Sequence, residues 1–254
     1  MRLPILLLIF LASLVFVEVT FAKQTSPSSG SALNDDFDSA FADDPLSADV
    51  QLISDPLERL NRGVFWFNDK MYLYFLKPVA RAYRVVPRPV RKSVRNFFSN
   101  LSNPVRIVNS ALQFKFADAG RETTRFFVNT TVGLGGLFDV ADRWGKIPKK
   151  EEDFGQTLGF YHVGQGPYLI LPLFGASSVR DVSGLAIDSL LDPLTLYMSR
   201  HWSLLDKAGY RGGLAVNYLS LDDDSYEKIK RDALDPYLFM RSAYAQYRVA
   251  KVAK

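Results

Sequence analysis

The sequence contains no cysteine and only two histidines, His162 and His201. Without thiols the chain forms no disulfides, so packing alone must hold its fold together. A structural zinc site draws on several Cys or His ligands, and this composition therefore argues strongly against one. The chain also offers no cysteine that could accept a lipid anchor.

Long apolar runs are missing after the first 22 residues. Residues 1–22 begin with Arg2, continue through the apolar run 3–17 and end in small residues before Lys23, which predicts a cleaved signal peptide. The alternative is an uncleaved membrane anchor, although the run is shorter than the ~20 residues that a spanning helix needs. Any contact of the remaining chain with a bilayer must therefore use amphipathic helices that enter it partway.

Residues 23–54 are rich in Ser, Asp, Ala and Pro and predict a disordered acidic linker. The folded domain is predicted at 55–254. Residues 1–54 hold seven acidic and two basic side chains, whereas the whole chain is +4, so the basic excess belongs to the folded domain. A basic exported domain meets anionic lipid rather than nucleic acid, which lies in another compartment.

Basic residues concentrate between Arg59 and Arg106, where Asp69 is the only acidic residue. Two interpretations stay open, a solvated helix face or a surface that contacts anionic headgroups. The residues assigned to headgroup contact are Arg81, Arg84, Arg88, Arg91, Lys92 and Arg95.

Amphipathic periodicity and helix-start signals predict an all-α fold. Asp55-Pro56, Asn103-Pro104 and Asp235-Pro236 each combine a capping side chain with proline in the first turn. Ser178 and Asp181 have the spacing of a capping box. The predicted inward stripes are Leu57, Leu60, Val64, Phe67, Met71, Tyr74 and Pro78, then Val90, Val94, Phe97 and Leu101, then Val105, Val108, Ala111 and Leu112.

The first predicted helix also carries aromatic residues off its stripe, namely Phe65, Trp66 and Tyr72. They fit either a helix between two protein layers or an interfacial helix with aromatic side chains at headgroup depth.

Two stretches are shaped by glycine and proline. Gly133, Gly135 and Gly136 do not fit a dinucleotide-binding motif and predict a helix end with a close-packed bend. The stretch 159–181 holds the apolar run 168–174, which Pro172 interrupts; we expect neither a long helix nor a paired strand there. It fits either a buried crossing loop or a wall for an apolar ligand.

The parts of a lipid hydrolase are weak in this sequence. Ser177 and Ser178 lack the G-x-S-x-G motif of a nucleophile elbow. His162 as base with Asp181 or Asp188 as its partner has no supporting spacing. The acidic triplet 151–153 is typical of a solvated turn. We therefore expect no enzymatic activity and no catalytic residues.

A set of collinear motifs resembles the MlaA (VacJ) family: DPLERLNR at 55–62, NFFSNL at 96–101, RFFVNT at 125–130, FGQTLG at 154–159, GPYL at 166–169 and DPY at 235–237. The resemblance implies a Gram-negative outer-membrane component of the Mla lipid-asymmetry pathway. Proteins of this family form a curved or ring-like helical body in one leaflet of the outer membrane. They associate with trimeric porins and pass phospholipids to the periplasmic carrier MlaC without a cofactor. The absent lipoprotein cysteine departs from the family pattern.

The resulting hypothesis is non-enzymatic phospholipid transport at the periplasmic side of the outer membrane. An envelope phospholipid hydrolase and a porin-docking scaffold without a lipid path remain the alternatives. The residues assigned to the lipid path are Leu134, Leu137, Phe138, Leu169, Leu171 and Phe174. Those assigned to a hinge or bend are Gly133, Gly135, Gly136 and Pro172.

Overall fold

The computed structural model describes residues 53–222 and 224–253, and this part of the chain is helical apart from one two-stranded hairpin. The predicted all-α class is confirmed. In chain order the elements are α3 (Glu58–Met71), η1 (Tyr72–Leu76), α4 (Lys77–Tyr83), α5 (Arg88–Leu101), α6 (Asn103–Leu112), α7 (Phe116–Thr131), α8 (Val140–Arg143), α9 (Phe154–Phe160), β1 (Tyr168–Leu171), β2 (Gly175–Ser178), α10 (Val179–Leu191), α11 (Pro193–His201), α12 (Leu204–Leu221), α13 (Ser225–Asp232) and α14 (Pro236–Val252).

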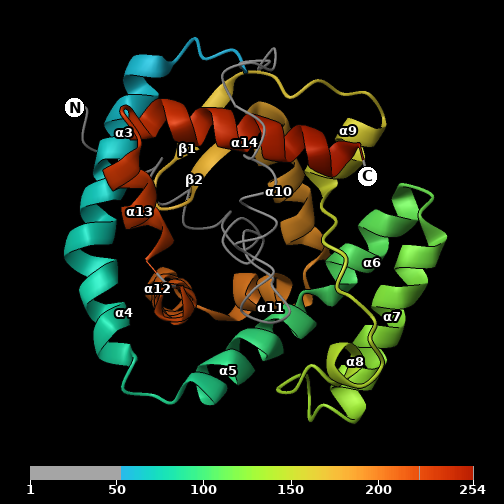
Figure 1. The fold of residues 1–254 in the computed structure, drawn as a ribbon. Coiled ribbons are helices and arrows are strands. Elements are labelled where there is room, and N and C mark those ends of the chain that lie inside the picture. The colour runs from blue at the N-terminus through green and yellow to red at the C-terminus, as the bar shows by residue number, and fades with distance from the viewer. Residues whose placement is uncertain (1–52, 223, 254) are drawn as a thin grey trace.

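The helices are arranged as a ring (Figure 1). The α3–η1–α4 rod forms one side, α5 continues along the next, α6, α7 and α8 form the opposite side, and α14 crosses back to α3. α10, α11, α12 and α13 lie within this outline. α12 packs against α4 and α5, and α10 packs against α9, so the inner helices brace the outer ones.

Helix starts follow the predicted chemistry at two of the four predicted sites. The Asp235 carboxylate accepts from two backbone N–H groups of α14, and the Ser178 hydroxyl accepts from the third backbone N–H of α10. The Asp55 and Asn103 cap predictions are wrong, because α3 begins at Glu58 and α6 begins at Asn103 itself, both without a side-chain cap. The Asp55 carboxylate accepts instead from the Asn61 amide at 2.7 Å and from the Tyr237 hydroxyl.

The apolar run 168–174 was predicted to contain no paired strand, and this is wrong for its first half. β1 pairs antiparallel with β2, with Leu171 opposite Gly175. Pro172 lies in the connection and costs no ladder hydrogen bond. The Asn68 side chain on α3 holds this turn, since its amide donates to the Leu171 carbonyl at 2.9 Å and its oxygen accepts from the Leu173 N–H at 2.6 Å.

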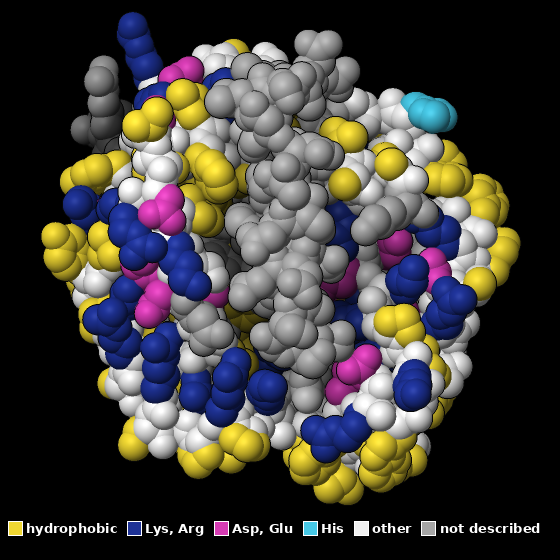
Figure 2. Space-filling model, viewed as in Figure 1, with side chains coloured by type: hydrophobic (Ala, Val, Ile, Leu, Met, Phe, Trp, Pro, Cys, Tyr) yellow, Lys and Arg dark blue, Asp and Glu magenta, His cyan; other side chains and the backbone are white. Residues whose placement is uncertain are grey.

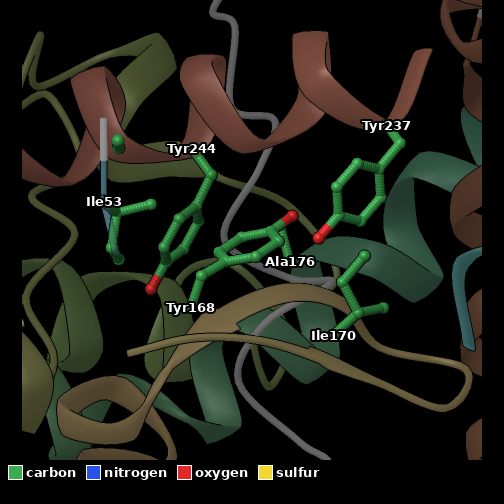
Figure 3. Close-up of a cluster of buried hydrophobic side chains, with 7 residues drawn as sticks. Ile53, Tyr168, Ile170, Ala176, Tyr237 and Tyr244 are labelled. Atoms are coloured by element: carbon green, nitrogen blue, oxygen red, sulfur yellow. The ribbon is translucent and has the colours of Figure 1, made fainter. Parts of the chain in front are cut away.

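The hairpin lies between α3 and α14 and carries the main apolar cluster (Figure 3). Tyr168 is fully buried, with its ring centroid 5.8 Å from Tyr244 and 6.2 Å from Tyr237, both on α14. The cluster consists of Ile53, Tyr168, Ile170, Ala176, Tyr237, Tyr244 and Ala245. Edge-on aromatic packing of this kind fixes the hairpin against α14.

The predicted end of the acidic linker needs a correction. Ile53 is buried in the cluster, and the Ser54 carbonyl accepts from the Tyr168 N–H at 2.8 Å. Both residues therefore belong to the folded domain, because Ile53 packs in its apolar cluster and Ser54 is hydrogen-bonded to β1. The signal-peptide prediction and the linker up to residue 52 lie outside the described residues.

Candidate lipid-contact surface

The outer helices bury polar residues and expose apolar ones. In α3 the buried residues are Asn61 and Asp69, and in α5 they are Arg91 and Asn100. In α7 the only apolar buried residue is Ala119. Water-soluble proteins usually show the opposite pattern, with charged residues almost never fully buried unless they are paired.

The exposed apolar side chains follow the ring. We call them the outer apolar surface; they have relative exposures between 53% and 72% and comprise Leu60, Trp66, Tyr74, Phe75 and Val79 on α3–α4, and Phe116, Phe127, Val132, Leu134 and Trp144 around α7–α8. Figure 2 shows hydrophobic side chains at the outer edge of the visible face and Lys and Arg nearer its middle. Apolar residues exposed in this number mark contact with lipid or protein.

The predicted inward stripe that begins on α3 is wrong at four of its seven positions, while Val64 is partly buried against the apolar cluster. The exposed members are Leu57, Leu60, Tyr74 and Pro78. Asn61 and Asp69 point inward instead. Periodicity correctly identified an amphipathic helix, but it could not show which face meets the protein. In the described part of the chain, no helix is long and apolar enough to cross a membrane.

Of the three predicted interfacial aromatic residues, only Trp66 is exposed, at 62%. The Phe65 ring packs edge-on against Tyr237, with centroids 5.8 Å apart. The Tyr72 hydroxyl donates to the Glu227 carboxylate at 3.0 Å, and burial raises the pKa of Tyr72 to about 12. Phe65 and Tyr72 are half-buried and contact other side chains of the protein, so Trp66 is the exposed member of the three, and the assignment to the interface stays a prediction.

One buried ionic network holds α6, α7 and α8 together. Arg106 on α6 donates to Glu122 on α7 at 2.9 Å, and neither side chain is more than 10% exposed. Arg125 donates to Asp139 at 2.7 Å, and the Asn129 amide donates to the same carboxylate at 2.9 Å. Burial favours a higher pKa for Asp139, but the Arg125 charge and these hydrogen bonds outweigh it and hold the pKa below its usual value.

A second buried network joins α9, α10 and α14. The Arg248 guanidinium donates to Asp153 at 2.9 Å and to Asp181 at 2.7 Å. The Tyr244 hydroxyl donates to Asp181 as well. These charges are paired on both sides, which is the condition under which buried ions are tolerated.

The residues assigned to the lipid path fall into two separate groups. Leu134, Leu137 and Phe138 are exposed in the bend after α7, next to Phe97 and Asn100 of α5. Leu169, Leu171 and Phe174 belong to the hairpin on the α3 side of the ring, and Phe174 is buried. The structure does not bring the two groups together into one wall.

The predicted bend glycines lie at the C-terminal end of α7. Gly136 has φ +94°, and a Cβ there would lie 2.5 Å from the Asn100 side chain. A Cβ on Gly133 would lie 2.3 Å from the Phe138 carbonyl oxygen. The bend thus needs glycine both for its conformation and for its close approach to α5.

The six basic residues assigned to headgroup contact are not equivalent. Arg81, Arg88 and Lys92 are exposed. Arg84 donates to the Asp222 carbonyl at 2.8 Å, and burial lowers the pKa of Arg95. Figure 2 shows Lys and Arg side chains gathered over the α4 and α5 side of the ring.

The assignment of Arg91 to headgroup contact is wrong. Its side chain is buried and donates to the Ser220 and Val86 carbonyls. Periodicity could not find this contact, since the α12 carbonyl that Arg91 binds is distant in sequence.

The residues considered for a hydrolase have other contacts. Ser178 caps α10, and His162 is exposed. Asp181 binds Arg248, and Asp188 accepts from the Asn109 amide at 2.7 Å and from the Phe154 N–H at 3.1 Å. Among residues 53–222 and 224–253, no three His, Cys, Asp or Glu side chains group together as metal ligands.

Sequence reasoning missed the polar interior. The Asn109 amide donates to Asp188, its oxygen accepts from the Thr157 hydroxyl at 2.8 Å, and Gln113 donates to Glu152 at 2.9 Å. The sequence did carry one signal for this interior. Asn and Gln residues recur within the amphipathic helices, and a solvated helix face does not require these residue types.

The ring of amphipathic helices, its polar interior and its outer apolar surface define the described part of the chain as a mainly helical protein of ring-like form. A family model described as "MlaA lipoprotein" matches residues 53–251. The chain belongs to the MlaA family.

Similar curated proteins and one solved structure support the assignment to this family. The Escherichia coli (strain K12) protein named "Intermembrane phospholipid transport system lipoprotein MlaA" is 39% identical over 206 residues, covering 78% of each chain. An uncharacterized protein of Rickettsia bellii is 36% identical over 202 residues, covering 79% of this chain and 77% of the relative. A solved structure reported as "Structural basis for maintenance of bacterial outer membrane lipid asymmetry" aligns with a TM-score of 0.66 and 39% identity. It covers 78% of this chain and 99% of the solved chain.

Proposed function

We propose that this protein transports phospholipids at the outer membrane without chemical change, taking those mislocalised in the outer leaflet toward a periplasmic carrier of the MlaC type. The outer apolar surface carries the proposal, because it would seat the ring in the apolar layer of one leaflet. The names of the curated relatives, which refer to intermembrane phospholipid transport, support the same assignment.

Attachment to the membrane is part of this proposal. The Escherichia coli relative is named a lipoprotein, whereas the 254-residue sequence holds no cysteine. We infer that the outer apolar surface contributes the attachment here, together with a trimeric porin as partner. Each fully exposed large apolar side chain that enters lipid contributes about 1.5–3 kcal/mol, so a few of them suffice for stable association.

The two groups of candidate path residues can be tested separately. We expect Leu134→Asp to slow lipid transfer if the bend after α7 contacts the moving lipid, and Leu171→Asp to slow it if the hairpin does. A charge in an apolar lipid path costs about 2.5–3.5 kcal/mol, which corresponds to a rate lower by about 100-fold. Leu234→Asp, at a fully exposed position between α13 and α14, is the control.

The measurement is transfer of labelled phospholipid from vesicles that contain the full chain to a purified carrier, with mass spectrometry of the lipids afterwards. Intact acyl chains and carrier-dependent transfer are the expected result. Released fatty acid would instead identify a hydrolase. Porin capture without any lipid transfer would identify a scaffold, and equal rates for all three variants would remove both assigned groups from the path.

A further inference from the structure

A basic cleft lies between α7 and the segment that leads to α9. It encloses about 650 Å³ and is lined by Gly120, Arg121, Thr124, Lys146, Ile147, Pro148 and Lys150. None of these residues belongs to the lipid path or to the headgroup contacts predicted from the sequence. Figure 2 shows Lys and Arg side chains on the α7 side of the ring as well, with hydrophobic side chains at its edge.

Buried groups hold the two walls of the cleft in place. Arg125 on α7 donates to the Ile147 carbonyl, and Glu122 accepts from the Lys150 N–H at 2.6 Å. Both α7 side chains are at most 4% exposed and also take part in the buried network with Arg106 and Asp139. The cleft is therefore a fixed feature between tied elements.

Positive charge dominates the cleft. Arg121, Lys146 and Lys150 line it, and the acidic side chain beside them is Asp118, which is 2.6 Å from Arg121 and 3.8 Å from Lys150. The α7 wall leaves open space at Gly120, since a Cβ there would have no atom within 4 Å.

Exposed aromatic residues flank the cleft. Phe116 and Phe127 lie on the same face of α7 as Gly120 and Thr124, at spacings of three and four residues, and are 65% and 61% exposed. Trp144, two residues before Lys146, is 72% exposed. Basic groups beside exposed aromatic side chains are typical of a lipid headgroup region, whereas a free anion requires only the charges.

We propose that this cleft binds the phosphate headgroup of an anionic glycerophospholipid, with the flanking aromatic residues against the upper part of its acyl chains. The site is separate from the transport path, and its test measures binding rather than transfer. Phosphatidylglycerol is the probe, because its headgroup carries a net negative charge that a zwitterionic headgroup lacks.

The experiment titrates the detergent-solubilised full chain with short-chain phosphatidylglycerol, with short-chain phosphatidylcholine and with inorganic phosphate. The first variant combines Arg121→Gln, Lys146→Gln and Lys150→Gln, whose side chains all reach the surface. The second, Gly120→Gln, places a side chain in the open space beside the α7 wall without changing the charge. The control combines Arg59→Gln, Arg200→Gln and Arg231→Gln, which removes the same charge from exposed positions elsewhere.

We expect one class of phosphatidylglycerol binding that phosphatidylcholine does not reproduce. It should weaken about fivefold for each basic residue removed from the cleft, and it should be lost in Gly120→Gln. The control should bind as the wild type does. Equal losses in both charge variants, with Gly120→Gln unaffected, would show diffuse surface attraction and overturn the proposal.

Two further outcomes would also overturn it. If inorganic phosphate displaces the lipid at equal concentration, the cleft is a phosphate site rather than a lipid site. If a synthetic peptide of the acidic residues 35–49 displaces it and binds more tightly than the lipid, the ligand is a polypeptide. Circular dichroism of each variant checks its fold, and the charge-neutral Gly120→Gln keeps the test valid if the triple variant is unstable.

Discussion

At the scale of single residues, the protein depends on close backbone contacts and on paired buried charges. Gly184 on α10 approaches α9 so closely that a Cβ would lie 2.3 Å from the Gly155 backbone nitrogen. Arg248 lies beside this contact and joins Asp153 to Asp181. Small and charged residues thus carry out packing that large apolar residues perform in a water-soluble core.

Gly184→Ala is expected to destabilise the fold, because the added methyl group must separate α9 from α10. Overpacking of this kind costs about 1–3 kcal/mol. Gly63→Ala on α3 is the matched control; its Cβ meets no atom within 4 Å, so it should stabilise by about 0.5–1 kcal/mol. Thermal unfolding of the two variants in one detergent compares them, and equal melting temperatures would contradict the close contact.

Because the pKa of Lys149 is shifted, we expect the free energy of unfolding to depend on pH. Burial, with the nearby Arg106 charge, lowers the pKa of Lys149 to about 8, although Glu151 lies 3.2 Å away. The unfolded chain keeps this proton up to about pH 10.4, so between about pH 8 and pH 10 the unfolded state binds more protons and stability rises with pH. Below pH 8 both states are protonated and this contribution is constant.

The check compares unfolding free energies of the wild type and Lys149→Met from pH 7 to pH 9.5. Above pH 8 the unfolding free energy of the wild type should rise relative to that of the variant, by at most about 1.4 kcal/mol per pH unit. Parallel curves over this range would mean that Lys149 keeps an ordinary pKa.

At the scale of elements, α13 and its neighbour η1 are the helical segments of the described chain in which no residue is buried. α13 is held to α3, η1 and α4 by polar contacts. Glu227 accepts from the Tyr72 hydroxyl and pairs with Lys77, while Lys230 lies 2.6 Å from Asp69. The partner segment Tyr72–Leu76 is a π-helix, a form that often marks functional sites.

Glu227→Gln should loosen α13, since it removes the charge that pairs with Lys77. A charged hydrogen bond contributes about 1.5–3 kcal/mol, so amide hydrogen exchange in α13 should become about tenfold faster or more. Asp232→Asn is the control, because its partner Arg231 lies on the same helix. If both variants exchange alike, α13 is held by something other than these ion pairs.

At the scale of the whole molecule, the outer apolar surface sets the environment of the ring. Polar groups that would be solvated elsewhere are paired inside, and Leu, Phe and Trp side chains face outward. Exposed apolar surface of this extent is typical of a site that contacts lipid or another protein.

Replacing Leu60, Trp66 and Phe75 together with Gln should weaken retention on phospholipid vesicles. Each loses about 1.5–3 kcal/mol of apolar burial, so the partition constant should fall by about tenfold or more per residue. Leu205→Gln with Leu234→Gln is the control, as both are at least 84% exposed but lie on or beside the inner helices. Vesicle flotation measures retention; equal loss in both variants would contradict a membrane-facing rim.

The sequence by itself determined the helical class, several helix starts and the membership of a family, because these depend on local chemistry and on motif order. The Asp235 and Ser178 caps need only side-chain oxygens next to free backbone N–H groups. It also determined that α3 is amphipathic.

Only the tertiary structure decided which face of α3 points inward, that β1 pairs with β2, and that Arg91 is buried. Each of these depends on partners distant in the chain, such as the Ser220 carbonyl that binds Arg91 and the α14 tyrosines that cover the hairpin. The hydrophobic periodicity of a helix shows only that one of its faces is more apolar than the other. Whether the apolar face meets protein or lipid depends on what surrounds the helix, and the paired buried charges of α6 and α7 show that here the polar face lies inside.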